Sequence, residues 1–258
     1  MRPLTLVLSL LVLAIAALVF QKPIPQSLDY HDFADHRTMF GIANFWNVVS
    51  NIPFLFIGFL GITKSFRNWN RNVNLERRWL PMLLFLGIFT IGIGSSYYHY
   101  APDNATLVWD RLPMTVAFMA IFTWLIYDFC EEKVGRFTFW IALIFGIFSV
   151  WYWQWTETQG KGDLRPYALV QFFPMLVMPF LFLICPQKVH YGRNVLLGGI
   201  FYALAKVCER FDPLIFTSTN SIFGGHALKH FLAAVALYYI VKIVDEKREI
   251  VRENNLQL

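Results

Sequence analysis

Residues 224–239 read GGHALKHFLAAVALYY, an apolar run that carries two histidines and a lysine near its start. His226 and His230 are four residues apart, a spacing that places both rings on one face of a helix. Because an imidazole is costly in hydrocarbon, histidines inside an apolar span indicate a functional site. Two imidazoles one helical turn apart also suit a divalent metal. The stretch therefore predicts a membrane-spanning helix that contributes to a metal site.

The rest of the chain has the composition of a polytopic membrane protein. Of its 258 residues, 57% are apolar and only 15% are charged. A soluble domain of this size does not need so much apolar surface. The net charge of +5 resides in short connections between apolar runs, which favours a positive-inside topology over nucleic-acid binding. The three cysteines form no C-x-x-C pair and predict neither a disulfide framework nor a zinc ribbon.

Eight apolar segments can be read with a window of about 19 residues. We expect them near residues 4–20, 44–63, 79–99, 110–130, 137–154, 167–185, 194–210 and 224–244. The predicted fold class is an all-α membrane protein, with a seven-transmembrane-helix core and one extra N-terminal hydrophobic helix. The expected domains are a transmembrane helix or signal anchor at 1–22, the seven-helix domain at 23–245 and a polar cytoplasmic tail at 246–258. A cleavable signal peptide is the alternative for the first segment, but no convincing small-x-small cleavage site follows it.

Basic residues predict the orientation of the helices. One set of connections and the C-terminus carry most of the Lys and Arg, and the positive-inside rule places that set in the cytoplasm: Lys64, Arg67, Arg71, Arg77, Arg78, Lys133, Arg136, Lys188, Arg193, Lys242, Lys247, Arg248 and Arg252. The opposite connections are richer in acids. Both termini are then cytoplasmic, in what we expect to be a bacterial inner membrane. His190 falls in a cytoplasmic connection, whereas His31 and His36 fall in the outer segment 21–43 and are expected as surface groups.

This orientation brings four polar residues to one depth, just beneath the outer face. His99 ends one apolar segment, Asp110 begins the next, and His226 and His230 lie at the start of the last. Three neutral imidazoles and a water form the arrangement of a catalytic zinc, whose open position binds hydroxide near neutral pH. The sequence therefore predicts a zinc site near the outer face.

Two further residues are candidates for the chemistry at this site. Asp110 is expected to orient a ligand or to take a proton from the bound water. Ser95 lies one turn before His99 and is expected to donate to an oxyanion or to hold the water. Plainer explanations exist for both, because serine is common at helix contacts and Asp110 suits a helix start with Pro113 in its first turn.

The two histidines of residues 224–239 can equally form a hydrogen-bonded packing pair. For the whole protein, the alternatives to an enzyme are a lipid receptor with a structural zinc and a transporter that uses the histidines as a relay. Few polar residues continue from the histidines toward the opposite face, which argues against transport.

Three blocks of sequence resemble the alkaline ceramidase family, within a seven-helix superfamily that includes adiponectin receptors and GPI-remodelling proteins. NFWNVVSNIPF at 44–54 is similar to E-F-W-N-T-x-S-N. GIGSSYYH at 92–99, followed by DRLPM at 110–114, is similar to G-x-G-S-x-x-F-H … D-E-L-P-M. GHALKH at 225–230 is similar to G-H-x-x-W-H. Together the blocks cover roughly residues 30–245.

The resemblance implies a reaction and a set of roles. His99, His226 and His230 would hold zinc. Asp110 would act on the zinc-bound water, and Ser95 would position that water or stabilise the oxyanion. The reaction would be hydrolysis of the ceramide amide to a fatty acid and a sphingoid base, so the partner is a membrane lipid substrate. The alternative is hydrolysis of another lipid amide or ester with an anionic head group.

The chain departs from the family pattern in the outer segment. The family binds a regulatory calcium with a D-W-x-E-x-N stretch and the Glu before F-W-N; here residues 32–37 read DFADHR, and Asn44 stands at the Glu position. Asp32 and Asp35 remain, but one ligand appears as Arg37. Although calcium is possible by resemblance, we predict that an Arg37–Asp salt bridge substitutes for its charge and that no calcium is bound. An ordinary polar loop is the alternative.

The second departure is Lys229, which replaces an aromatic residue of the family between the two histidines. A lysine at this depth needs a partner or a route to water. Candidate partners are Glu209, Glu157 and Asp163, and Lys206 is spaced to pair with Glu209. Contact with an anionic head group is the other role that we expect for Lys229.

Overall fold

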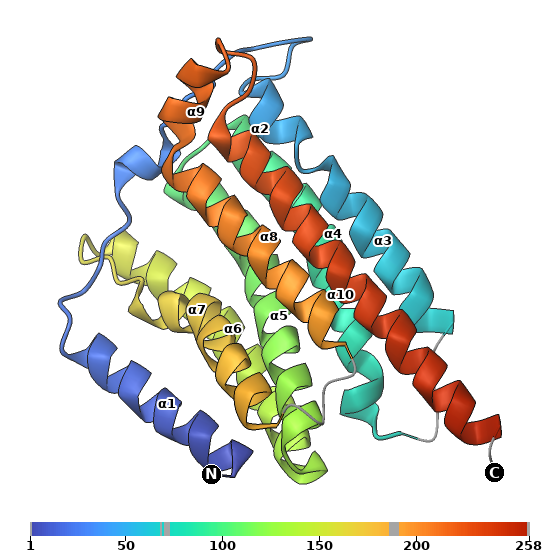
Figure 1. Cartoon of the computed structure of the whole chain (residues 1–258). Coiled ribbons are helices and arrows are strands. Elements are labelled where there is room, and N and C mark those ends of the chain that lie inside the picture. The colour runs from blue at the N-terminus through green and yellow to red at the C-terminus, as the bar shows by residue number, and fades with distance from the viewer. Residues whose placement is uncertain (1, 68, 70–72, 186–190, 257–258) are drawn as a thin grey trace. The chain divides into compact units, whose positions relative to one another are not determined.

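The computed structural model describes residues 2–67, 69, 73–185 and 191–256, so Arg71, Lys188 and His190 lie outside the described part. The helices are α1 (Pro3–Val19), α2 (Phe45–Val49), α3 (Ile52–Arg67), α4 (Leu75–Tyr100), α5 (Asn104–Phe129), α6 (Glu132–Thr158), α7 (Arg165–Ile184), α8 (Gly192–Arg210), α9 (Asp212–Ser218) and α10 (Gly225–Leu256) (Figure 1). A 3₁₀ turn covers Leu28–His31. Within the described residues, the only extended pairing is an isolated bridge between Met39 and Ile42.

Six helical segments of the described chain are long and apolar enough to cross a bilayer: Phe45–Arg67, Leu75–Tyr100, Asn104–Phe129, Glu132–Thr158, Arg165–Ile184 and Gly225–Glu246. Helix α1 is also apolar but shorter, at 17 residues. In hydrocarbon every backbone polar group must be satisfied internally, which helices achieve. The chain is therefore an integral membrane protein of the all-α class, and the prediction from sequence is confirmed.

Two helices differ from the other spans. Helix α8 lies where an apolar segment was expected, but it does not reach the apolar composition of the six because it carries Arg193, Lys206, Glu209 and Arg210. Helix α10 continues to Leu256, so the segment expected as a polar tail is helical as far as it is described. Glu, Lys and Arg are good helix formers, which explains why this polar sequence extends the helix.

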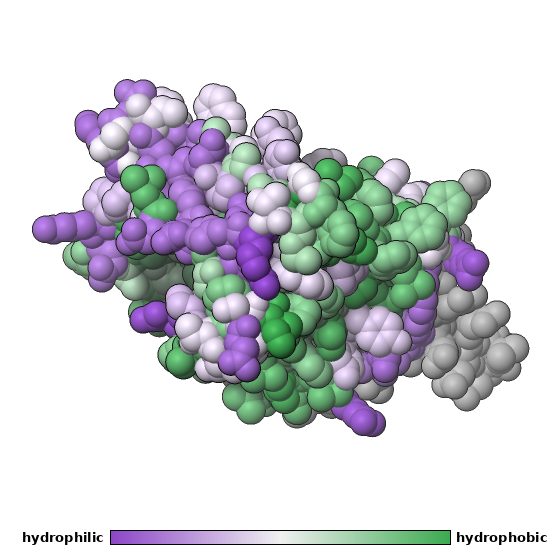
Figure 2. Space-filling view, turned by 90° about the horizontal axis from the view of Figure 1, so that it is seen from above, coloured by the Kyte–Doolittle hydropathy of each residue, from purple (hydrophilic) through white to green (hydrophobic). Residues whose placement is uncertain are grey.

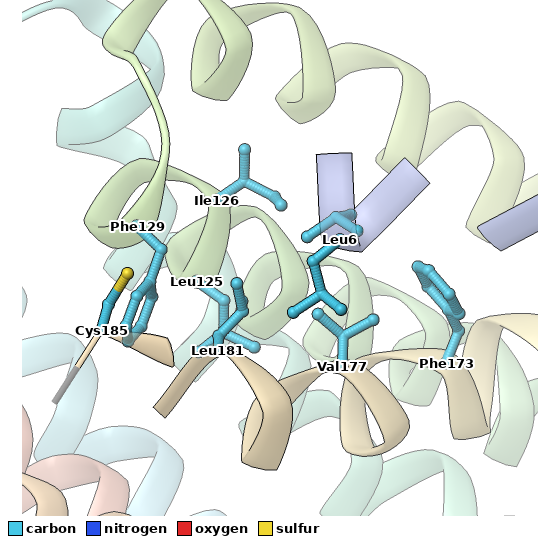
Figure 3. Packing of buried hydrophobic residues seen from close by; sticks show 9 residues of the cluster. Leu6, Leu125, Ile126, Phe129, Phe173, Val177, Leu181 and Cys185 are labelled. Atoms are coloured by element: carbon cyan, nitrogen blue, oxygen red, sulfur yellow. The ribbon is translucent and has the colours of Figure 1, made fainter. Parts of the chain in front are cut away.

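The chain forms two compact units, and α4 and α5 contribute residues to both. In the unit made of Met1–Ser27, Asn70–Gly87 and Arg111–His190, α1 packs against α7 (Figure 3). This contact is part of a buried apolar cluster to which α5 also contributes: Leu6, Val7, Leu125, Ile126, Phe129, Phe173, Val177, Leu181 and Cys185. The N-terminal helix is thus part of an apolar core.

A charged pair in the same unit fixes the chain just after α1. The guanidinium of Arg165 donates to the carbonyl of Gln21 at 2.7 Å and pairs with the carboxylate of Asp163 at 2.8 Å. Burial alone would raise the pKa of Asp163, but the hydrogen bonds from Arg165 outweigh it and lower that pKa below its usual value.

The second unit, made of Leu28–Trp69, Ile88–Asp110 and Tyr191–Leu258, contains all of the expected site residues. In it, α3 and α8 both pack along α10 (Figure 1). The backbones of α4 and α5 touch, because a Cβ at Gly94 would lie 2.0 Å from the carbonyl oxygen of Trp109. Small residues permit such approaches in membrane helices.

Large apolar side chains are exposed along the helices, as a lipid-facing surface requires. They include Phe56 and Phe59 of α3 and Phe137 and Trp151 of α6. Figure 2 shows hydrophobic side chains over a large part of the visible surface, beside a region where hydrophilic side chains gather.

Candidate metal centre

The three histidines expected as metal ligands lie together. His99 is close to the C-terminal end of α4, and His226 and His230 occupy the first two turns of α10. One nitrogen of each ring lies within 4.8 Å of the corresponding atoms of the other two. The residues are 1%, 5% and 3% exposed, respectively, so the group is buried.

The geometry of this group is compatible with a tetrahedral metal ion. The Nε2 atoms of His99 and His226 are 3.3 Å apart. Two nitrogens that each lie about 2.0–2.1 Å from one tetrahedral zinc are separated by about 3.3–3.4 Å. Among the described residues, no carboxylate or thiolate joins the three imidazoles in this group. Three protein ligands leave a fourth position open, which is the arrangement of a catalytic rather than a structural site.

Ser50 determines which nitrogen His230 presents. The Oγ atom of Ser50 lies 2.7 Å from Nδ1 of His230 and donates to the carbonyl of Asn47 at 3.3 Å. Since a hydroxyl has a single proton, an Oγ that donates to Asn47 accepts from an Nδ1–H of His230, and this tautomer leaves Nε2 with a lone pair that can bind a metal. Ser50 occupies the break between α2 and α3, in a block quoted above for its resemblance, but the sequence alone indicated no role for it.

His226 is placed by a carboxylate that sequence reasoning missed. Asp212, at the start of α9, accepts the backbone N–H of His226 at 2.8 Å and that of Ala34 at 2.9 Å. A helix N-terminus has unsatisfied N–H groups, so the buried carboxylate both satisfies one and fixes the first turn of α10. The Asp-Pro start of α9 was the available signal, but it indicates only a helix start.

The outer segment covers the histidines with an aromatic ring. The ring of Phe33 lies 4.7 Å from that of His99 and 4.4 Å from that of His226, measured between centroids. Asn44 donates to the backbone carbonyl of His99 at 2.9 Å. The Nδ1 atom of His99 is buried and has no hydrogen-bond partner in the described part of the chain. The ring of His99 is therefore held by packing and by the Asn44 contact, whereas the ring of His230 is held by a hydroxyl.

Ser95 and Asp110 lie where α4 meets α5. Both are buried, and Ser95 is one turn before His99 on α4. The close approach at Gly94 sets the turn that carries Ser95 against the residue before Asp110. The carboxylate of Asp110 is not part of the three-histidine group. The structure thus places both residues at the contact between α4 and α5, but not in the three-histidine group.

Of the three partners expected for Lys229, the structure shows Glu209. Its Nζ atom lies 3.1 Å from Oε1 of Glu209, whose other carboxylate oxygen pairs with Lys206. The same Nζ is 2.9 Å from Nε2 of His226. The other two candidates have contacts in their own unit: Glu157 accepts from Trp153, and Asp163 pairs with Arg165.

The segment at 32–37 contains a two-point ion pair. Arg37 donates to the Asp35 carboxylate from Nε at 2.8 Å and from Nη2 at 2.6 Å, and this hydrogen bonding raises the pKa of Arg37. Nη2 also donates to the carbonyl of Ile222 at 2.9 Å. Asp32 points elsewhere, because it is exposed and lies 3.0 Å from Nε2 of His36. Asp32, Asp35, Arg37 and Asn44 were grouped as the former calcium site by resemblance. Of these four, only Asp35 and Arg37 form an ion pair with each other.

His31 is not a free surface group. Its ring nitrogens lie 2.9 Å from the hydroxyl of Tyr98 and 2.9 Å from Oδ1 of Asn104. The ring therefore connects the outer segment to the residues at the end of α4 and the start of α5, whereas His36 is exposed as expected.

Comparison with protein families identifies a match for most of the chain. No curated protein matches the chain. The family model described as Ceramidase matches residues 34–257. This match covers most of the chain and includes the three histidines and Ser50, together with Ser95 and Asp110. The resemblance that the three sequence blocks indicate is therefore confirmed, and the chain belongs to the ceramidase family.

Proposed function

We propose that this protein is a zinc-dependent hydrolase that cleaves the amide bond of ceramide or a closely related membrane lipid. The products are a fatty acid and an amine base. The observation that carries the proposal is the buried group of three imidazoles, in which two Nε2 atoms stand 3.3 Å apart and no fourth protein ligand closes the set in the described residues. Membership of the ceramidase family supports the reaction class.

His99, His226 and His230 would hold the zinc ion. When bound, zinc polarises a carbonyl and lowers the pKa of a water molecule to near neutrality. Ser50 keeps Nε2 of His230 available for this role, and Asp212 keeps the first turn of α10 in place. These contacts fix the ligands before a substrate arrives.

Asp110 and Ser95 would handle the proton and the developing charge. Asp110 takes a proton from the attacking water, whose oxygen bonds to the carbonyl carbon of the amide. Ser95 donates to the carbonyl oxygen as negative charge accumulates on it. When the C–N bond breaks, the proton passes from Asp110 to the leaving nitrogen, so the two products form without another reactant.

We also propose that the centre lies near the outer face of a bacterial inner membrane, with both termini in the cytoplasm. The distribution of Lys and Arg among the connections supports this orientation. A site at this depth can receive the acyl chains from the bilayer while the polar amide remains near the interface.

Metal analysis and two substitutions test the proposal. The purified protein should contain one zinc per chain and hydrolyse a ceramide in detergent micelles, and removal of the metal with a chelator should abolish turnover. His230→Ala should lose zinc and turnover together, whereas Asp110→Ala should keep zinc and lose turnover. His36→Ala is the matched control, because this histidine is exposed, and it should change neither quantity.

Two results would contradict the proposal. An active His230→Ala variant would remove this residue from the ligand set. Full zinc occupancy without hydrolysis of any lipid amide or ester in a panel would favour a receptor with a structural metal.

We further propose that the loop at 32–37 works without calcium. The guanidinium of Arg37 occupies both oxygens of the Asp35 carboxylate, which would otherwise attract a cation. Hydrolysis should therefore be the same with EGTA and with added calcium; because EGTA also binds zinc, the zinc content of the protein is measured in both conditions and must be unchanged. Activity that vanishes in EGTA and returns with calcium alone would contradict this proposal.

A further inference from the structure

Three charged side chains form a group on α8 and α10, beside the histidines. Lys206 and Lys229 both pair with the carboxylate of Glu209. The side chains of Lys229 and Glu209 are only 16% and 18% exposed, while that of Lys206 is 38% exposed. Two cations on one carboxylate leave a positive charge that Glu209 does not balance. A largely buried charge of this kind in a membrane protein needs an additional partner.

Stabilisation of the α8–α10 contact does not explain this arrangement by itself. Lys206 is sufficient to neutralise Glu209, and the second lysine adds charge where desolvation is costly. An apolar or aromatic residue at position 229 would pack between the helices without that cost. The position of the ammonium group therefore calls for a functional explanation.

The contact between Lys229 and His226 indicates where that function lies. Nζ of Lys229 is 2.9 Å from Nε2 of His226, the nitrogen that also faces Nε2 of His99. A neutral imidazole nitrogen has one lone pair, which cannot accept a hydrogen bond from Lys229 and bind a metal at the same time. When His226 acts as a ligand, the ammonium must give up this contact. Of its three donors, Glu209 can retain one, and the others remain beside the site.

We propose that Lys229 binds an anionic group of the substrate, so that the preferred lipid carries a carboxylate or a phosphate close to the amide that is cleaved. The inference rests on the proposed function and specifies the substrate class of the same site. The anion must lie within a few bonds of the reacting carbonyl, because Nζ is adjacent to a nitrogen of the ligand set. The bond from Lys229 to such a group is charge-assisted and poorly screened at this depth.

Binding of three lipids to the zinc-loaded protein tests the inference. The probes are ceramide, which is neutral, N-palmitoylglycine, which carries a carboxylate beside the amide, and ceramide 1-phosphate. Native mass spectrometry in detergent reports bound intact lipid, products and zinc separately. The wild type should bind at least one anionic lipid about tenfold or more tightly than ceramide. The better of the two anionic lipids identifies the carboxylate or the phosphate as the recognised group.

Substitutions assign this preference to Lys229. Lys229→Met should remove the preference. The affinity for the anionic lipid should fall about tenfold or more, while the affinity for ceramide and the zinc occupancy change little. Lys229→Arg keeps the charge and should retain the preference, which guards against an effect of misfolding. Lys242→Met is the matched control on the same helix, because Lys242 lies over the rings of Tyr238 and Tyr239 and not in this group. It should bind all three lipids as the wild type does.

The outcomes separate this inference from the proposed function. Equal binding of ceramide and both anionic lipids by the wild type would overturn the inference, even if ceramide is hydrolysed and the function stands. An equal loss of affinity for all three lipids in Lys229→Met would also overturn it. If hydrolysis by this variant shows a uniform fall in kcat at unchanged KM for every lipid, Lys229 would instead stabilise the oxyanion. If anionic lipids bind in a Lys229-dependent way but none of the three lipids, ceramide included, is hydrolysed, the proposed function fails and the recognition remains.

Discussion

At the scale of single residues, Ser50 decides the chemistry that His230 can perform. A neutral imidazole can carry its proton on either nitrogen, and only the other nitrogen can bind a metal. A Ser50 hydroxyl that donates to Asn47 accepts from Nδ1 and leaves Nε2 as the nitrogen that can bind a metal. Such orienting groups strengthen metal binding although they do not touch the ion.

Substitution of Ser50 should therefore weaken the metal site without unfolding the protein. Ser50→Ala is expected to lower zinc affinity about 10- to 100-fold, as measured by competition with a chromogenic chelator. Ser65→Ala is the matched control, since Ser65 is also buried but donates to a carbonyl of its own helix at 2.7 Å. Equal zinc affinities for Ser50→Ala and the wild type would show that the hydroxyl does not orient the ring.

The residues differ in how far sequence could identify them. The three histidines were predictable, because imidazoles are rare in apolar spans and their positions converge on one end of the helices. Ser50, Asp212 and Phe33 were not, because each acts through a contact with a distant segment. Serine at a helix break and aspartate at a helix start both have ordinary local explanations. Their roles become visible only when the segments are packed.

At the scale of helices, the site depends on the close contact of α4 and α5. Gly94 lies in α4 between Ile93 and Ser95 and has no side chain to hold the α5 backbone away. Ser95 and His99 follow on the same helix, so a shift at Gly94 would move both. The glycine therefore matters for the geometry of the centre although it carries no reactive group.

Addition of one methyl group should reveal this dependence. Gly94→Ala should destabilise the protein by about 1–3 kcal/mol, because the new Cβ would overlap the carbonyl of Trp109 and the helices must separate. Thermal unfolding in detergent and zinc titration measure the two effects. Gly199→Ala in α8 is the control: a Cβ there meets nothing within 4 Å, so the higher helix propensity of alanine should leave stability unchanged or raise it by up to about 1 kcal/mol. A Gly94→Ala variant as stable as Gly199→Ala would show that the contact is not tight.

The helices themselves were largely predictable, since long apolar runs can satisfy their backbone in a bilayer only as helices. The segment expected at 44–63 is instead divided into α2 and α3. At this break Asn51 donates its side-chain amide to the carbonyl of Asn47, which competes with regular helical pairing. Hydropathy does not detect such a break because the flanking residues are apolar.

At the scale of the whole molecule, acid should weaken the connection that follows the N-terminal helix. The folded protein lowers the pKa of Asp163 below the value of about 3.9 expected in an unfolded chain. Its ion pair with Arg165 therefore contributes full stability above that value, and the contribution is lost as the pH falls through the lower, folded-state pKa.

The comparison of Asp163→Asn with the wild type measures this contribution. The variant should unfold at a lower temperature at pH 7, and the difference should narrow as the pH is lowered below about 4. Asp29→Asn is the control, because Asp29 is exposed, and it should follow the wild type at every pH. If the difference in unfolding temperature between Asp163→Asn and the wild type does not depend on pH, the charge of the carboxylate is not what stabilises the loop.

The carboxylate of Asp212 joins Ala34 to His226, two backbone amides that lie far apart in the chain. Two of the three imidazoles also belong to α10, which is synthesised after α1 to α9. Neither the contact of Asp212 with both amides nor the group of three histidines can form before α10 has been synthesised. If the centre holds zinc, as proposed, loading must wait for α10, and a nascent chain stalled before this helix would be inserted in the bilayer without a complete metal centre.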